Sequence, residues 1–286
     1  MLTKKQLDQR KQGIGGSDVG AILGLSKWKT PLDVYMDKTG KSEPSEQTTW
    51  QKIGHQVEEH ILIPFFEEKY ATTVNKLDTK LHKDYSFLLA NVDGVALDGK
   101  ILIECKNVGG YKNTDEWGEA GSDQVPYNYH VQCLHYMEVL NIDECILIAL
   151  FGGNKIEEFR IKRNKEVYKI ILQKLKIFWT QNVLKNVPPE PKNISDMKIL
   201  FPFAKENSSV QANIETLKNI SKIKELQEQK KEIESKIRNR EIKLKSFMKD
   251  HEILMSTDNV KLASWKNQRR GEKNIRTFRI SGNLNI

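Results

Sequence analysis

The sequence predicts a mixed α/β fold, in which a central sheet flanked by helices is followed by a long helix and a β-hairpin. Three observations lead to this prediction. Helical and strand patterns alternate as far as Val187, a proline-rich segment over residues 188–191 interrupts them, and a long amphipathic stretch follows. We therefore expect a core over residues 1–190 and a C-terminal extension over residues 191–286.

The helices of the core are marked by signals at their ends. Thr30 is a suitable capping residue, Pro31 fits the first helical position, and Gly40 would end that helix. Pro126 likewise opens a segment in which apolar residues recur at helical spacing. The predicted helices cover residues 17–25, 31–39, about 46–70, 126–140 and 164–186.

Strands are predicted between these helices. Several short strands are expected between residues 72 and 106, and two longer ones at 144–151 and 155–161, joined by the turn sequence Gly152-Gly153-Asn154. The stretch from Ile101 to Cys105 is apolar apart from its fourth residue, which is typical of a buried central strand.

A hairpin over residues 92–106 brings charged side chains together. Asp98-Gly99 supplies its turn. Because side chains alternate along a strand, Glu104 and Lys106 share one face, and Asp93 on the neighbouring strand can reach the same place. The opposite face would carry Ile101, Ile103 and Cys105.

This grouping of charges has two interpretations. Two carboxylates and a lysine suit a divalent cation that prefers oxygen ligands, together with a nucleophilic water, which is chemistry for cutting phosphodiesters. Taken alone, a surface hairpin with a cross-strand salt bridge is the commoner origin of such a pattern. The apolar surroundings of Glu104 favour the first interpretation, because a buried carboxylate without a partner is costly.

Three further motifs could belong to the same site. Arg10 and the glycine-rich turn Gly13–Asp18, which opens a helix, suit a phosphate, with the hydroxyl of Ser17 as a further donor. Glu58 on the long helix of the core could point across the sheet toward the metal. Gln132 could hold the attacking water or a phosphate oxygen. Each motif by itself also fits a plain turn or a structural residue.

Composition and charge limit the class of protein. The 286 residues carry a formal net charge of +8. No apolar run approaches the ~20 residues that span a bilayer, and the first residues lack the apolar segment of a signal peptide. Cys105, Cys133 and Cys145 form no CxxC pair, which argues against a zinc site and for reduced thiols. We therefore expect an intracellular protein without a membrane partner.

The extension is predicted to contain a long amphipathic helix over about residues 213–251. Lys230 and Arg240 interrupt its apolar seam, so packing on the chain's own core and packing on a neighbouring subunit both remain open. A hairpin over about 258–281 follows.

The last segment, residues 261–286, is strongly basic, since it contains seven lysines and arginines and a single acidic residue, Glu272. With Trp265 and Phe278 interleaved, it could contact phosphates and stack on bases, or it could be a solvated hairpin that only aids solubility.

The candidate motifs occur in a fixed order along the chain. They are Arg10 with Ser17, Gly54-xxx-Glu58, Val92-Asp93-Gly94, Glu104-Cys105-Lys106 and Tyr129-xx-Gln132. In this order they resemble the YqaJ viral recombinase family, relatives of the phage lambda exonuclease within the PD-(D/E)XK nucleases. The resemblance covers about residues 8–190 and is especially close at the opening stretch 13–31. Val92 replaces the usual proline before the aspartate, and Leu134 stands where many members have a second glutamine.

The resemblance implies a restriction-endonuclease-like core and a metal site. Asp93 and Glu104 would bind Mg²⁺ or Mn²⁺ with help from the backbone carbonyl of Cys105. Glu58 would complete the acidic cluster. Lys106 would orient or deprotonate the attacking water and stabilise charge at the phosphorus.

The resemblance also implies a substrate and partners. Gln132 would assist Lys106, while Arg10 and Ser17 would hold a phosphate at or near the 5′ end. Family members degrade one strand of linear duplex DNA from the 5′ end, often as ring-shaped trimers. They pass the 3′ overhang to a single-strand annealing protein. A phage or prophage exonuclease in the bacterial cytoplasm is the expectation.

Two alternatives stay open at this point. One is a structure-selective or nicking DNA endonuclease on the same core. The other is a DNA-binding scaffold without catalysis, in which the basic tail and the long helix organise a recombination complex.

Overall fold

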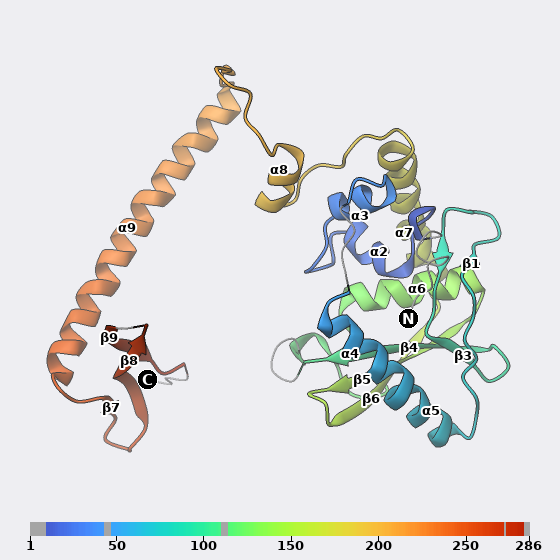
Figure 1. The fold of residues 1–286 in the computed structure, drawn as a ribbon, viewed down its shortest axis with the longest axis horizontal. Helices are drawn as coiled ribbons and strands as arrows, with labels where there is room; N and C mark the ends of the chain where they lie inside the picture. Colours follow the sequence, from blue (N-terminus) through green and yellow to red (C-terminus); the bar gives the residue numbers. More distant parts are fainter. Residues whose placement is uncertain (1–9, 43–46, 110–113, 272, 283–286) are drawn as a thin grey trace. The chain divides into compact units, whose positions relative to one another are not determined.

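The computed structural model describes residues 10–42, 47–109, 114–271 and 273–282. Contacts divide the chain into two compact units, residues 1–204 and 205–286 (Figure 1). No helix in these described ranges is both long and apolar enough to cross a membrane. The mixed sheet between helices, the long C-terminal helix and the terminal hairpin were all predicted, and the fold class is confirmed.

The first unit continues past residue 190, where the sequence analysis placed a boundary. Helix α8 (Ile194–Leu200) follows the prolines, and Leu200 packs against the core. The buried carboxylate of Asp196 accepts a hydrogen bond from the hydroxyl of Thr30 at 3.0 Å and one from the backbone N–H of Lys192 at 2.7 Å. The proline-rich segment therefore lies within the first unit, because the residues after it are anchored there.

Helix α3 begins at the predicted capping residue, Thr30. The Thr30 side chain accepts the Asp33 N–H, and Asp33 accepts in return from the Thr30 N–H. Asn164 caps its helix with a single hydrogen bond, which its side chain accepts from the Val167 N–H. The helices are α2 (Gly16–Ile22), α3 (Pro31–Lys38), α4 (Thr49–Val57), η1 (Glu58–Leu62), α5 (Ile63–Tyr70), η2 (Thr114–Glu116), α6 (Tyr127–Leu140), α7 (Lys165–Ile177), η3 (Phe178–Val183) and α8.

The central sheet has the order β3-β4-β5-β6. Strand β4 (Ile101–Val108) lies between β3 (Gly94–Ala96), which is antiparallel to it, and β5 (Glu144–Phe151), which is parallel. Strand β6 (Lys155–Lys162) pairs antiparallel with β5. A separate small sheet joins β1 (Lys80–Leu81) to β2 (Leu89–Ala90).

The two faces of the sheet are covered by different helices (Figure 1). Leu102 belongs to the hydrophobic cluster that contains the buried residues of α6, whereas Ile103 belongs to the cluster that contains Leu62 and Phe66 of η1 and α5. Alternate residues of β4 therefore point to opposite layers, as predicted. Glu104 follows Leu102 at the two-residue spacing and faces the α6 layer.

The second unit consists of a helix and a three-stranded sheet. These are α9 (Ile214–Met248), β7 (Ile253–Met255), β8 (Lys261–Arg270) and β9 (Lys273–Ile280), in the order β7-β8-β9. Met248 and Ala263 are buried where helix and sheet meet. The apolar seam of α9 is exposed: Ile223 and Ile233 keep 55% and 56% of their surface.

The aromatic residues of the basic hairpin are engaged within this unit. The guanidinium of Arg276 lies 3.6 Å from the ring centre of Trp265, and it donates hydrogen bonds to the backbone carbonyls of Lys249 and His251 at 2.8 and 3.1 Å. Phe278 has the ammonium of Lys245 5.0 Å from its ring centre. These contacts make Trp265 and Phe278 parts of the hairpin's own packing rather than free stacking groups.

Candidate active site

The hairpin of β3 and β4 places Asp93 opposite Glu104. Gly94 pairs with Ile103, so Asp93 comes opposite Glu104 one residue beyond the ladder, and opposed residues of an antiparallel pair share a face. A carboxylate oxygen of Asp93 accepts the backbone N–H of Cys105 at 2.7 Å. The side chain of Asp93 is therefore tied to β4.

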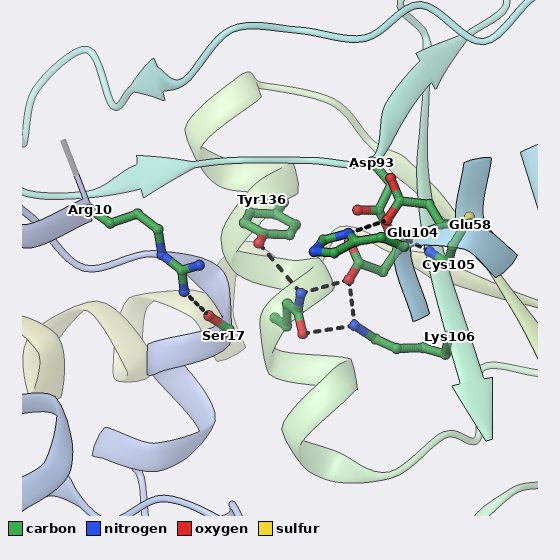
Figure 2. A network of polar contacts seen from close by, with 10 residues as sticks. Arg10, Ser17, Glu58, Asp93, Glu104, Cys105, Lys106 and Tyr136 are labelled. Carbon is green, nitrogen blue, oxygen red and sulfur yellow. Dashed lines mark hydrogen bonds and ion pairs between the residues drawn. The ribbon is translucent and has the colours of Figure 1, made fainter. Parts of the chain in front are cut away.

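Glu104, Lys106 and Gln132 form a closed triangle of polar contacts (Figure 2). The Lys106 ammonium lies 2.5 Å from Oε1 of Glu104, and the Gln132 amide donates to the same oxygen at 2.6 Å. The Gln132 carbonyl accepts from Lys106 at 3.3 Å. Strand alternation brings the first two residues together, and the packing of α6 on that face of the sheet adds the third.

The second oxygen of Glu104 has no such partner. Glu104 is 2% exposed, and its Oε2 atom is buried without a hydrogen bond to any described residue. An unpartnered carboxylate oxygen in an apolar layer costs free energy. An oxygen-seeking cation would satisfy it, which makes this donor set suitable for Mg²⁺ or Mn²⁺.

The cluster carries more negative charge than Lys106 can neutralise. Burial and the charge of Asp93 raise the pKa of Glu104 to about 8, although Lys106 opposes this. Burial also raises the pKa of Asp93. For Lys106, burial alone would lower the pKa, but the attraction of Glu104 and Asp93 outweighs it and the pKa is raised.

Glu58 reaches the cluster from the other helix layer. It begins the π-helical segment η1, which contacts β4. Burial and the charge of Asp93 raise the pKa of Glu58 to about 7. His55 lies 3.5 Å from Glu58, a contact that the sequence did not predict. The neighbouring Glu59 points away and pairs with Lys76 at 3.4 Å.

Within the described ranges, no three His, Cys, Asp or Glu side chains form a ready-made metal cluster. Glu104 has one oxygen engaged by Lys106 and Gln132, and Asp93 has one engaged by Cys105. Each carboxylate therefore retains one oxygen outside these contacts. The backbone carbonyl of Cys105, predicted as a further ligand, remains a prediction.

Arg10 contacts Ser17, which lies on α2. The guanidinium of Arg10 donates to the Ser17 hydroxyl at 2.8 Å. Figure 2 shows this pair on one side of Tyr136 and the Glu104–Lys106 pair on the other. Burial and the charge of Glu104 raise the pKa of Tyr136, while Lys106 and Arg10 act in the opposite direction. Tyr136 therefore lies within the electrostatic influence of both groups of charges.

A buried ion pair fixes the glycine-rich turn. Lys38 lies 2.7 Å from the carboxylate of Asp18, and it donates to the backbone carbonyl of Arg10 at 2.7 Å. Asp18 also accepts the Gly15 N–H at 3.1 Å. Although burial raises the pKa of Asp18, Lys38 and Arg10 hold it below its ordinary value. This network engages one N–H of the turn that was predicted to face a phosphate.

Sequence reasoning missed the roles of Lys38, Tyr136 and His55. Lys38 and Tyr136 act through contacts between elements. His55 contacts Glu58 three residues further along the same helical stretch, a local spacing that could have signalled it. Leu134, at the position of the family's second glutamine, is 1% exposed and belongs to the hydrophobic core. It makes no polar contribution to the site.

The fold has solved counterparts. The alkaline exonuclease LHK-Exo of Laribacter hongkongensis matches with a TM-score of 0.50 at 14% identity, over 65% of this chain and 94% of the other. The same enzyme in complex with dAMP matches with a TM-score of 0.51 at the same identity and coverage. At this identity, the likeness concerns the fold.

Sequence comparison identifies relatives more directly. The model of the YqaJ-like viral recombinase domain matches residues 5–143. Protein YqaJ of Bacillus subtilis, itself uncharacterized, is 32% identical over 259 residues, which cover 88% of this chain and 80% of that protein. Such coverage includes part of the C-terminal extension as well as the core. The chain belongs to the YqaJ-like viral recombinase family.

Proposed function

We propose that this protein is a metal-dependent exonuclease that hydrolyses one strand of linear duplex DNA from the 5′ end. The observation that carries the proposal is the buried Oε2 of Glu104, which lacks a hydrogen bond beside Asp93 while Lys106 and Gln132 occupy the other oxygen. The family and the exonuclease-like fold support the same reaction class.

Mg²⁺ or Mn²⁺ fits this donor set. Asp93, Glu104 and the Cys105 carbonyl would hold the ion, with Glu58 completing the acidic cluster. When bound, the ion supplies Lewis-acid chemistry and makes a water nucleophilic at neutral pH. It would also neutralise the excess negative charge that now raises the pKa of Glu58 and Glu104.

The other residues act on the water and on the phosphate. The Lys106 ammonium orients the attacking water and stabilises the charge that develops at the phosphorus. Gln132 holds Lys106 and Glu104 in place and can turn its amide toward the water or a phosphate oxygen. Arg10 and Ser17 hold the phosphate at or near the 5′ end.

The biological setting extends the same proposal. The reaction would leave a 3′ overhang for a single-strand annealing protein. It would release mononucleotides, the class of molecule to which dAMP belongs. The enzyme would act in the cytoplasm of a bacterial host as a homo-oligomer, with a trimer as the expected state. These points rest on family membership.

Linear duplex labelled at either the 5′ or the 3′ terminus tests the reaction, its direction and its metal requirement. We expect early release of the 5′ label with Mg²⁺ or Mn²⁺ and none with a chelator. Covalently closed circular DNA should stay intact. If the protein cuts the circular DNA, the proposal becomes an endonuclease on the same core instead of an exonuclease. DNA binding without metal-dependent release would favour the scaffold.

A further inference from the structure

A cavity of about 640 Å³ opens beside the proposed catalytic residues. Lys106 and Gln132 line it, together with residues of α2, the α2–α3 connection, α4, the end of β4, the Glu116–Trp117 segment and α6. Its volume is within the range of small-molecule sites. A substrate that occupies it would lie directly against the Lys106 ammonium.

Aromatic rings form much of the cavity wall. Trp28 and Trp50 line it and remain 64% and 60% exposed. Trp28 stacks on Tyr129, with ring centres 6.4 Å apart and an interplanar angle of 23°. Tyr129 in turn lies 5.9 Å from Trp117 and has the Lys106 ammonium 4.8 Å from its ring centre. The aromatic surface thus extends from solvent to the catalytic lysine.

The position of Trp28 is fixed by its local backbone. The Ser26 hydroxyl accepts the N–H groups of Trp28 and Lys29, each at 3.2 Å, and so closes a turn. Tyr129 supports one side of the ring. A large apolar ring held this way with most of its surface exposed is unusual for a group that serves only packing.

The charges around the wall suit a polyanion. Lys27, Lys29 and Lys106 line the cavity, and among the described lining residues Glu116 is the single carboxylate, already paired with Lys27 at 2.8 Å. A larger cavity of about 1060 Å³ at the β5–β6 end has two carboxylates, Glu119 and Glu157, and one lysine, Lys155, which pairs with Glu157 at 2.7 Å. Nucleic acid therefore fits the aromatic cavity better, although it is the smaller of the two.

We infer that this cavity is a nucleobase site, in which an unpaired base of the strand being cut stacks on the exposed face of Trp28. Lys29 contacts the sugar-phosphate backbone of the same strand. Every base offers a π face, so the site tolerates any sequence. A base inside a duplex has both faces covered by its neighbours, so only an unstacked nucleotide can enter. The inference rests on the proposed function and adds the group that holds the substrate strand.

Binding to single strands tests the site without requiring catalysis. The full-length protein is titrated, in the presence of chelator, with a short oligothymidylate and with a chain of the same length built from abasic sugar phosphates. Stacking contributes about 1–3 kcal/mol per base, so the wild type should prefer the base-bearing strand by about 5- to 150-fold. Trp28→Ala should remove most of this preference and leave the affinity for the abasic chain unchanged, while Trp28→Phe should retain much of it.

Tyr127→Ala is the matched control, because Tyr127 is an aromatic residue of α6 that is 76% exposed and does not line the cavity. It should keep the wild-type preference. The nucleobase site is overturned if Trp28→Ala keeps the wild-type preference, or if the wild type itself shows no preference. A partner other than nucleic acid would then be the occupant of the cavity. If the wild type releases nucleotides from linear duplex but shows no Trp28-dependent preference, the exonuclease stands and this inference fails. If the wild type shows a Trp28-dependent preference but releases no nucleotides from linear duplex, the exonuclease is rejected and the base-binding site stands.

Discussion

At the scale of single residues, Glu104 has two oxygens in different situations. One oxygen is held by Lys106 and Gln132, and the other is buried without a hydrogen bond. A structural ion pair would engage both, because a buried acceptor left open is costly. The cost is understandable at a site that must bind a cation, since sites of this kind are shaped for the bound state.

The substitution Glu104→Gln should separate function from stability. We expect metal-dependent nucleotide release to fall by about 100-fold or more, because the amide cannot act as an anionic ligand. The free energy of unfolding without metal should not fall, because burial already disfavours the charged form of Glu104, whose pKa is about 8, and Asp93 remains to face Lys106. The two measurements are single-turnover digestion of labelled duplex and urea unfolding.

Glu59→Gln is the control for this experiment. Glu59 is an exposed acid that pairs with Lys76, so its removal should change digestion little. Unchanged digestion by Glu104→Gln would reject the assignment of Glu104 to the metal site.

His135 should make the fold sensitive to acid. It is fully buried, with its two ring nitrogens 2.9 Å from the Tyr168 hydroxyl and from the Leu89 carbonyl. Burial lowers its pKa to about 4, so the unfolded chain binds a proton at a pH where the folded protein does not. The stability that this histidine contributes is present above about pH 6.5 and is lost as the pH falls toward 4, by about 3 kcal/mol.

Urea unfolding at pH 7.5 and 4.5 measures this effect. His135→Gln should be less stable than the wild type at the higher pH, but should lose less stability on acidification. The difference between the two proteins isolates His135 from the other titrating groups, including His82 and His130, whose pKa values burial also lowers. Equal losses in both proteins would contradict the prediction.

The residues of the site could be predicted where local rules reach or where they belong to a motif of the family. Glu104, Lys106 and Asp93 follow from strand alternation and one turn, and the structure brings them together. Lys38 and Tyr136 come from α3 and α6 and meet the site only through packing between elements. A sequence pattern contains no distance between separate helices, so these two could not be found.

At the scale of elements, helix α2 approaches α6 closely because of Gly16. A Cβ atom built on Gly16 would lie 2.4 Å from the ring of Tyr136. This approach places Ser17, to which Arg10 donates, close to Tyr136 (Figure 2). Gly16 is therefore needed for the close packing of α2 on α6 at least as much as for exposing backbone N–H groups in the turn.

Gly16→Ala should destabilise the protein by about 1–3 kcal/mol, because the ring is buried and cannot move away freely. Gly54→Ala provides the contrast. Gly54 lies within α4 with no atom within 4 Å of the added Cβ, so alanine should stabilise the helix by about 0.4–1 kcal/mol. Urea unfolding of both variants checks the signs, and a neutral Gly16→Ala would show that α2 can shift without cost.

Element positions were predicted well where caps and turns mark them. Thr30, Pro126 and Asn164 begin their helices in the structure as in the sequence analysis. The π-helical segment η1 was not predicted, because an extra residue in one helical turn leaves little trace in an apolar pattern. The anchoring of α8 by Thr30 was missed for the same reason as Lys38, since it depends on a contact between distant segments.

At the scale of the whole molecule, the chain combines a family core with an extension that has its own packing. The alignment with the Bacillus subtilis relative covers 88% of the chain, so the extension is shared at least in part. The seam of α9 is exposed within its unit, and the basic hairpin uses Trp265 and Arg276 to hold itself together. Any contribution of the hairpin to DNA binding must then come from charge rather than from stacking.

The exposed basic residues of the hairpin should contact DNA phosphates. Deleting residues 261–286 should lower the affinity for DNA and flatten its salt dependence, but it would also remove strands β8 and β9 from the second unit. Replacing Lys261, Lys273 and Arg279 by glutamine tests charge alone, because all three side chains are exposed. Each phosphate contact contributes about 0.9 to the slope of log K against log salt, so the slope should fall by up to about 3. The same exchange at Lys165, Lys169 and Lys174, which are exposed on α7, controls for the change in net charge. If the slope of log K against log salt is equal in the two triple variants, the hairpin has only a structural role.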